Sequence, residues 1–367
     1  MKIKMKINIY YTVDELSRYM YFLLKYIDSQ LKKKKFINFK IISTEFSNKV
    51  SYKEENEFFR NIIWINQNKI YSWDDLKLET PDIYFQSGWS KKPFNHLSKL
   101  TKQKNKNSKI ILVSDNSYQK RKIRQILGAI FFKIFLKKKF DFAWVPGLSG
   151  KKLMIKFGFE EKKIFTKMYS SLIDVYKNLT KVKKRKKQFL FVGQFIKRKN
   201  VERLIDVFRS LNVSNKEWKL LLVGNGNLDL KKNKTKNIKI IDHLSPSKLS
   251  KLYNESLFFI LPSTQDHWAL VVHEASLCGC FLLLSKNIGS ITELANKKNS
   301  IVFDPNSKSD LQKSFIKAIA LTNKQLDIAN KESEKLASSY NYKNSYKEFI
   351  KIVDKSTKLD NLIYKAD

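Results

Sequence analysis

The stretch LFFILPSTQDHWALVVHEASLCGCFLLLS, Leu257–Ser285, contains the pattern that decides the fold. Two apolar runs, LFFILPS (257–263) and FLLLS (281–285), flank a helical segment that is almost equally apolar. Strands without polar alternation are buried on both faces, which is typical of a parallel sheet covered by helices. The stretch therefore predicts a strand–helix–strand unit of an α/β protein.

The same alternation of strands and amphipathic helices runs through the rest of the chain. In the second half, further apolar strands are predicted at 188–193, 218–224, 237–242 and 300–303. In the first half the pattern is looser, with strands predicted at 6–11, 36–42, 82–86, 109–115 and 140–146 and the clearest helix at Val13–Leu31. We therefore predict two Rossmann-like, doubly wound α/β domains.

Domain boundaries are predicted from changes in composition. The N-terminal domain is predicted to cover 1–167 and the C-terminal domain 188–345. The segment 168–187 is interpreted as a basic linker, because it ends in six basic residues out of seven. A final helix, 346–367, is predicted to pack back on the N-terminal domain.

Length and composition limit the class of protein. A chain of 367 residues with 43% apolar residues is long and apolar enough for two packed domains. The longest apolar stretches, such as 126–132, are far shorter than the roughly 20 residues that span a bilayer. The N-terminus lacks the features of a signal peptide, and Cys278 and Cys280 are too close in sequence for good disulfide geometry. We expect a cytoplasmic protein with reduced thiols.

The net charge of +38 raises the question of a nucleic-acid or membrane partner. Residues 1–187 hold 43 basic and 16 acidic residues, a net charge of +27, so most of the excess belongs to the first half. Two explanations are open, a genome whose codons favour lysine and a real electrostatic role. No nucleic-acid-binding motif is recognisable, so we expect no nucleic-acid partner.

Unusual residues of the second half cluster after the predicted strands, where open α/β sheets bind their ligands. Gly193 is followed by three basic residues, Lys197–Lys199, and the loops after the other strands hold 224–226, 266–269 and 289–293. Gly224 and Gly226 fit two positions of a dinucleotide-binding glycine pattern, but Asp229 occupies the third. A dinucleotide site is therefore disfavoured.

A carboxylate, Glu274, lies in a predicted helix that is apolar nearly all round, from Ala269 to Cys278. Such a helix is buried, so its carboxylate requires hydrogen-bond donors. Helical side chains lean toward the N-terminus, so Glu274 is predicted to face the crevice at the strand ends, which Asp266 also borders. Lys199 and Arg198 supply counter-charge for an anion, so a negatively charged ligand with hydroxyl groups, such as a sugar nucleotide, is predicted.

The segments at 191–208, 220–230 and 244–295 resemble the nucleotide-sugar domain of glycosyltransferase family 4. The resemblance covers about residues 188–305, with much weaker likeness to the acceptor domain of polysaccharide-assembly members at 84–90 and 140–165. It implies the GT-B fold, two Rossmann-like domains facing across a cleft, and transfer of a sugar with retention at the anomeric carbon. The donor implied is a UDP- or GDP-sugar, the acceptor is a glycan or lipid-linked molecule, and no cofactor or metal is required.

The resemblance also assigns roles to individual residues. Asp266 and Glu274 match the family's pair of acidic residues, the first on the donor sugar hydroxyls and the second on the ribose. Lys199 matches the lysine that neutralises the diphosphate, and it and Asp266 are the catalytic candidates. The remaining donor-binding candidates are Gly193, Arg198, Leu244, Trp268, Ala269 and Leu270, the last three through backbone N–H groups.

Three positions depart from the family pattern. Asp266 stands where a glutamate is usual, Gln194 where many members have an arginine, and Ala269 where a glycine lets the backbone approach the phosphate. Arg198 is the candidate substitute for the missing arginine. The departures leave open a relative that binds sugar nucleotides without catalysis, and the charge leaves open a basic nucleic-acid-binding protein.

Other candidate residues have competing interpretations. His96, Asp115 and Asn116 lie near predicted strand ends of the first domain and are candidates for the acceptor side. His267, His273, Cys278 and Cys280 are potential zinc ligands, but their spacing matches no known site, so no metal is expected. Glu293 is either a carboxylate favoured by a helix N-terminus or a ligand contact.

The stretch 120–140 combines an apolar helical stripe with basic residues at both ends. This pattern is typical of helices that lie on anionic membranes, but it also suits a helix that packs on its own sheet. Both can hold if the stripe faces the core while Lys133 and Lys137–Lys139 face lipid. We therefore predict peripheral, salt-reversible association of the first half with an anionic membrane.

Overall fold

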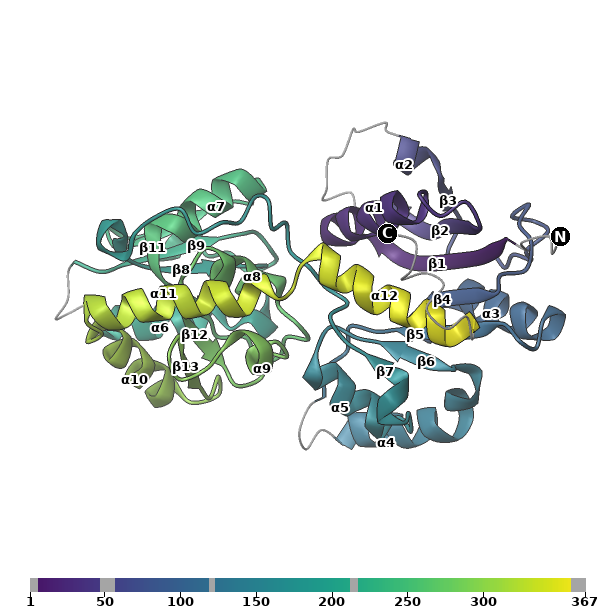
Figure 1. Cartoon of the computed structure of the whole chain (residues 1–367). Coiled ribbons are helices and arrows are strands. Elements are labelled where there is room, and N and C mark those ends of the chain that lie inside the picture. The colour runs from purple at the N-terminus through teal and green to yellow at the C-terminus, as the bar shows by residue number, and fades with distance from the viewer. Residues whose placement is uncertain (1–5, 47–56, 119–122, 212–216, 358–367) are drawn as a thin grey trace. The chain divides into compact units, whose positions relative to one another are not determined.

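The computed structural model describes residues 6–46, 57–118, 123–211 and 217–357. It divides the chain into two compact units, and the chain crosses between them at Ser170–Ser171 and at Asn341–Tyr342. The N-terminal unit consists of the described residues up to Ser170 together with the last helix, and the C-terminal unit consists of those from Ser171 to Asn341 (Figure 1).

The N-terminal unit is a parallel sheet of seven strands in the order β3-β2-β1-β4-β5-β6-β7. Its strands are β1 (Ile7–Leu16), β2 (Ile37–Phe46), β3 (Ile62–Trp64), β4 (Ile83–Ser87), β5 (Lys109–Val113), β6 (Phe142–Trp144) and β7 (Ile164–Phe165). Its helices are α1 (Arg18–Leu31), α2 (Glu57–Arg60), α3 (Lys92–Lys104), α4 (Ile123–Phe131), α5 (Leu148–Lys156) and α12 (Tyr342–Thr357). The five predicted strands are confirmed, and the short β3 and β7 were not predicted.

The C-terminal unit is a parallel sheet of six strands in the order β10-β9-β8-β11-β12-β13. Its strands are β8 (Lys186–Val192), β9 (Lys219–Val223), β10 (Ile238–Ile241), β11 (Ser256–Leu261), β12 (Phe281–Ser285) and β13 (Ser300–Phe303). Its helices are α6 (Val201–Leu211), α7 (Pro246–Glu255), α8 (Leu270–Leu277), α9 (Ile291–Leu294), α10 (Lys308–Ile319) and α11 (Asn323–Ser338). All six predicted strands are confirmed, so the doubly wound α/β fold is present in both units.

The start of the first helix differs from the prediction. Val13–Leu16 continue β1, and α1 begins only at Arg18. These residues pair with the end of β2, so the backbone hydrogen bonds of the sheet extend the strand past the point where helical periodicity begins. The prediction of a helix from Val13 was therefore wrong by five residues.

The segment interpreted as a linker, 168–187, lies mostly inside the C-terminal unit. Arg185, in the middle of the basic run, is buried, and its guanidinium donates to the backbone carbonyls of Tyr253, Ser256 and Cys278. Asn254 in turn binds the backbone at Leu179. Within a run of basic residues, one arginine thus fixes the segment to α7 and to the loop before β12.

The helix α12 packs on the sheet of the N-terminal unit, although it is the last element of the chain. Phe349 stacks on Phe85 of β4 with ring centroids 4.8 Å apart and also contacts Trp144 of β6. The helix begins at Tyr342, four residues before the predicted start, and its predicted end, 358–367, lies outside the described residues.

Candidate active site

The C-terminal sheet reverses its strand order between β8 and β11. The strands β9 and β10 extend it on one side, and β12 and β13 extend it on the other. Loops that leave such neighbouring strands diverge and open a crevice at the carboxyl ends, where α/β proteins bind ligands. The residues after β8 include Lys199, and those after β11 include Asp266, so the topology brings the two catalytic candidates together.

Lys199 and Asp266 form a buried ion pair. Lys199 Nζ contacts Asp266 Oδ2, and both residues are buried. Arg198 Nη1 lies 3.8 Å from the same oxygen, while half of its side chain stays exposed. Two cations therefore share one carboxylate, and the net positive charge suits an incoming anion.

Backbone hydrogen bonds fix these side chains in place. The carbonyl of Arg198 accepts from the Thr264 backbone N–H at 2.8 Å, which ties the loop after β8 to the loop after β11. Asn200 has a left-handed backbone, with φ of 59°, and its side chain donates to the carbonyls of Pro262 and Pro305. The Asp266 backbone also bridges to the loop after β12.

Gly224 and Gly226 have a structural role in the same region. A Cβ at Gly224 would lie 1.9 Å from the carbonyl oxygen of Gly193, and one at Gly226 would lie 2.3 Å from that of Phe195. The two glycines let the loop after β9 approach the loop after β8, and the Phe195 N–H donates across that contact to the Asn225 carbonyl. Close backbone packing accounts for this glycine pair.

The N-terminus of α8 borders the site. Its N-cap, Ala269, has a left-handed backbone with φ of 62° and ψ of 75°, and no side chain caps the helix. The first N–H groups of a helix have no intrahelical partner and carry partial positive charge, so an uncapped N-terminus is suited to bind an anion. Leu270 is the first helical residue, as the prediction of a helix from about Ala269 requires.

Glu274 is half-buried on α8, and its Oε2 accepts a hydrogen bond of 3.0 Å from Tyr253 Oη of α7. Burial, followed by the nearby carboxylate, raises the pKa of Tyr253 well above its usual range, so the phenol stays protonated and donates. Leu244 lies half-buried in the loop between β10 and α7. Sequence reasoning missed Tyr253, because a tyrosine on an amphipathic helix carries no distinguishing signal.

Trp268 and His273 pack around a second tyrosine that sequence reasoning missed, Tyr340. The ring centroid of Tyr340 lies 5.1 Å from that of Trp268 and 6.1 Å from that of His273. Trp268 is buried, and its Nε1 has no hydrogen-bond partner among the described residues. These aromatic side chains support the N-terminal half of α8 from one side.

His273 is a structural residue. Its Nδ1 accepts from the Ser171 N–H at 3.2 Å, and its Nε2 lies 3.0 Å from the Ala337 carbonyl, to which it donates. Complete burial lowers its pKa to about 4, so the ring is neutral and both nitrogens are occupied. Cys278 and Cys280 are free and buried, and the described residues contain no group of three or more His, Cys, Asp or Glu side chains arranged to hold a metal ion.

A cavity of about 330 Å³ lies in the N-terminal unit at the corresponding place in the sheet, where the strand order reverses between β1 and β4. Asp115 and Asn116 line it, but His96, which lies on α3, does not. Tyr11 also lines this cavity, is fully buried, and its Oη has no hydrogen-bond partner among the described residues.

The charged side chains around this N-terminal cavity are mainly acidic. Asp14, Glu15 and Asp115 line it together with one cation, Lys91, which pairs with Asp14 at 2.8 Å. Tyr19 Oη lies 3.4 Å from Tyr169 Oη at the same cavity. Carboxylates and phenols are hydrogen-bonding partners for hydroxyl groups, and the negative charge of the carboxylates disfavours a phosphate.

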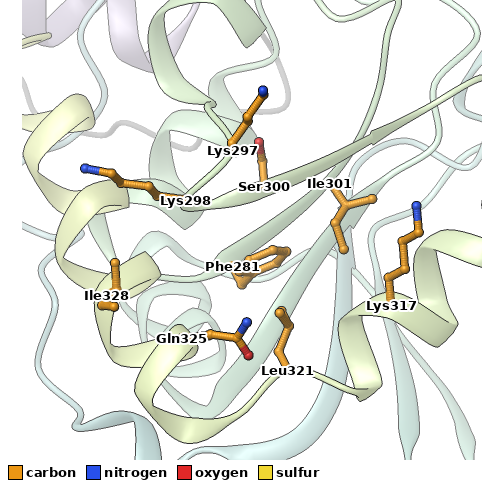
Figure 2. Close-up of a pocket in the computed structure, with 9 residues that line it drawn as sticks. All are labelled: Phe281, Lys297, Lys298, Ser300, Ile301, Lys317, Leu321, Gln325 and Ile328. Atoms are coloured by element: carbon orange, nitrogen blue, oxygen red, sulfur yellow. The ribbon is translucent and has the colours of Figure 1, made fainter.

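A second cavity of about 340 Å³ lies in the C-terminal unit but at the opposite edge of the sheet (Figure 2). It is lined by the first residues of β12 and β13, Phe281 and Ser300, and by Lys297, Lys298 and Lys317. Amino-terminal strand ends are not where α/β sheets bind substrates, and the lysines are at the surface. This cavity is therefore not part of the candidate active site.

Residues 173–335 match a protein-family model described as "Glycosyl transferases group 1". The match covers less than half of the chain and shows that this part is similar to that family. The matched range covers most of the C-terminal unit, including the Lys199–Asp266 pair and α8. This match supports the expected enzyme class, a transferase of sugars.

A curated relative of this chain is an uncharacterized glycosyltransferase of Methanocaldococcus jannaschii, 24% identical over 137 residues. The alignment covers 35% of this chain and 37% of that protein, so the chain spans little more than a third of the relative it matches. This likeness is confined to part of the molecule.

Solved structures match the fold of the whole chain. A glycosyltransferase from Rickettsia africae superposes with a TM-score of 0.71 at 14% identity, over 99% of this chain and 100% of that chain. The lipopolysaccharide outer core galactosyltransferase WaaB has a TM-score of 0.70 at 14% identity, over 95% and 99%. Anabaena HepE, solved with UDP and glucose, has a TM-score of 0.70 at 12% identity, over 95% of this chain and 100% of that chain. The two parallel-sheet domains of the GT-B fold are thereby confirmed.

Proposed function

We propose that this protein is a retaining, metal-independent glycosyltransferase of family 4. It transfers a sugar from a nucleotide-diphosphate sugar, a UDP- or GDP-sugar, to a glycan or lipid-linked acceptor in polysaccharide or cell-envelope synthesis. The observation that carries the proposal is the Lys199–Asp266 pair beside the uncapped N-terminus of α8, inside the range that matches the group 1 family. Anabaena HepE, which has a similar fold, was solved in complex with UDP and glucose, and this supports a donor of the same class.

The chemistry follows from the charges at this site. Lys199, Arg198 and the first N–H groups of α8 form a positive site for the donor diphosphate, and Asp266 accepts hydroxyl groups of the donor sugar. As the bond between the sugar and the diphosphate breaks, negative charge grows on the leaving phosphate, and these groups stabilise it. The acceptor hydroxyl attacks from the same face and gives its proton to the leaving phosphate.

In this proposal, donor binding releases the ion pair and so activates the site. Without a ligand, Lys199 is neutralised by Asp266, so a buried charge is not left unpaired. A diphosphate offers Lys199 a second anionic partner, and the donor sugar offers Asp266 hydroxyl donors. Glu274 accepts the ribose hydroxyls beside Tyr253, and the nucleotide base lies against the backbone near Leu244.

The acceptor is assigned to the cavity of the N-terminal unit. Asp115, Asn116 and the unpartnered Tyr11 Oη are hydrogen-bonding groups for an uncharged sugar. The enzyme acts at the cytoplasmic face of an anionic membrane when its acceptor is linked to lipid. No helix of the described residues is both long and apolar enough to cross a membrane, so this association is peripheral in the proposal.

The test is a thermal-shift and calorimetric screen with UDP, GDP and their common sugar conjugates, followed by a turnover assay. A ligand at about 100 times its dissociation constant stabilises a protein by about 2.7 kcal/mol. We expect one nucleotide to bind and its sugar conjugate to be turned over in the presence of a chelator. Binding without turnover on any acceptor supports a relative that has lost catalysis, and salt-sensitive oligonucleotide binding alone supports a nucleic-acid-binding protein.

Lys199→Ala tests the electrostatic role. Because charge on the diphosphate grows in the transition state, we expect kcat to fall by about a hundredfold and donor affinity by less. Lys197→Ala is the matched control, since Lys197 is an exposed lysine of the same turn. Loss of affinity with unchanged kcat contradicts this role.

A further inference from the structure

The helix α4 and the π-helical turn after it, Phe132–Leu136, expose a continuous apolar face. Its side chains recur every three or four residues and are between 52% and 74% exposed. We call them the apolar face; they are Ile123, Ile126, Leu127, Ile130, Phe131, Ile134 and Phe135. This finding corrects the hypothesis that the stripe packs on the domain's own sheet.

The opposite side of the same helix is what anchors it to the N-terminal unit. Ala129 and Phe132 are buried in the core, and the Phe132 ring stacks on Phe157 with centroids 4.4 Å apart. In Figure 1, α4 lies beside α5 at one edge of the unit. The helix therefore already has a core-facing side, and the apolar face is a second, outward one.

The charged residues of the segment that carries the apolar face are all basic. No aspartate or glutamate occurs between Asn116 and Phe140, a range that holds eight lysines and arginines. Lys133, Lys138 and Lys139 are exposed. Lys137 instead lies over the ring of Phe159, at 4.5 Å, and burial lowers its pKa, so it does not face outward as predicted.

We propose that the apolar face inserts into the interface of an anionic lipid bilayer, with the exposed lysines on lipid headgroups. Apolar side chains surrounded by cations match the acyl chains and the headgroups of such a membrane together. A second copy of the chain is a poorer occupant, because pairing two of these faces brings like charges together. Charge alone would give adsorption at the membrane surface. In insertion, the apolar face itself also contributes binding energy.

The helix that carries the apolar face contacts a segment that lines the acceptor cavity. Gln125 on the first turns of α4 donates to the Ser117 carbonyl at 2.9 Å, and the preceding residue, Asn116, lines the cavity. Insertion of α4 therefore brings this cavity toward headgroups of a lipid-linked acceptor. The link to acceptor chemistry rests on the proposed function, whereas lipid insertion itself is measured without turnover, so the two ideas fail separately.

The experiment measures vesicle cosedimentation of the full chain with phosphatidylcholine vesicles and with vesicles of equal parts phosphatidylcholine and phosphatidylglycerol. The test variant is the double substitution Ile130→Ser/Ile134→Ser, which keeps the charge. The matched control is Ile70→Ser/Ile316→Ser, which removes two isoleucines of similar exposure elsewhere. A third variant, Lys138→Gln/Lys139→Gln, removes charge and keeps the apolar face.

We expect the parent and the control to bind the anionic vesicles, and the apolar-face variant to partition at least about tenfold less. The lysine variant weakens binding mainly at low salt, because exposed charges are screened. The fluorescence that Phe135→Trp adds should be quenched by brominated lipid, which reports insertion rather than surface contact. Equal binding of the parent and the apolar-face variant overturns the proposal. So does a lipid-free, concentration-dependent dimer that only the apolar-face variant loses.

Discussion

The helices α4 and α8 carry similar sequence signals and have opposite surroundings. Both are rich in apolar side chains, and both follow a strand of a parallel sheet. On α8 the apolar residues Val272, Ala275 and Leu277 are buried, between the sheet and the neighbouring α11 (Figure 1). On α4 only Ala129 is buried among the described side chains, and the large apolar residues face outward.

The difference between α4 and α8 shows the limit of what apolar periodicity in a helix can predict. An apolar helix must be covered on every side, but its sequence does not state whether protein or lipid provides the cover. On α8, the few polar residues, His273, Glu274 and Ser276, each have partners within the C-terminal unit. In the segment 116–140, which contains α4, the charged residues are all basic, which suits a helix that faces lipid.

The largest expected effect comes from the same substitution on both helices. Leu277 on α8 is 6% exposed and Leu127 on α4 is 61% exposed. We expect Leu277→Ala to lower the free energy of unfolding by about 2–5 kcal/mol and Leu127→Ala by less than about 0.5 kcal/mol. Chemical denaturation of both variants measures this. Equal losses contradict the claim that α4 has an outward apolar face.

The buried histidine of α8 predicts a pH effect that α4 lacks. The pKa of His273 is about 4 when folded and near 6.5 when unfolded, so the unfolded chain binds the extra proton. The contribution of the neutral His273 to the free energy of unfolding is therefore fully present above pH 6.5. About 3 kcal/mol of it is lost as the pH falls toward 4. We expect denaturation midpoints of His273→Gln to depend less on pH across this window. His243→Gln, at an exposed histidine, is the control.

Glu274→Ala separates the functional from the structural content of α8. We expect the dissociation constant for the nucleotide diphosphate to rise about tenfold, because the ribose contact is lost. The free energy of unfolding should fall by only about 1 kcal/mol, less than for Leu277→Ala, since removing a half-buried carboxylate also relieves its desolvation. Glu217→Ala, at an exposed glutamate, is the control. Unchanged nucleotide affinity would remove Glu274 from the donor site.

The sheets were predictable from the sequence, because continuous apolar runs such as 257–261 and 281–285 are typical of strands that are buried on both faces. The strands β3 and β7 were not, since three and two residues are too few to show a pattern. The start of α1 was missed because sheet hydrogen bonds, which the local sequence does not encode, continue β1 to Leu16.

For the candidate site, the sequence predicted that Lys199 and Asp266 border one crevice but not that they contact each other. Their positions after two strands placed them at this crevice, the resemblance to glycosyltransferase family 4 supplied their expected roles, and the switch in strand order explains why they meet. Their mutual neutralisation depends on a contact between side chains that are 67 residues apart in the sequence. Tyr253 and Tyr340 were missed because their roles arise from the packing of α7, and of the residues that follow α11, beside α8. Arg185 was hidden for the same reason, within a run of basic residues.

The smallest expected effect concerns Ala269, where the N-cap of α8 departs from the family's glycine. Its left-handed backbone, with φ of 62°, costs an alanine roughly 1–2 kcal/mol, whereas glycine adopts it freely. Glycine also gains more backbone freedom on unfolding, which offsets part of the relief, so we expect Ala269→Gly to stabilise by about 0.5 kcal/mol.

Ala275→Gly is the matched control in the same helix, where the backbone is right-handed and the methyl group is fully buried. There the same substitution should destabilise by about 1 kcal/mol or more. Thermal unfolding measures both, and a destabilising Ala269→Gly would show that the methyl group contributes more by packing than its backbone strain costs.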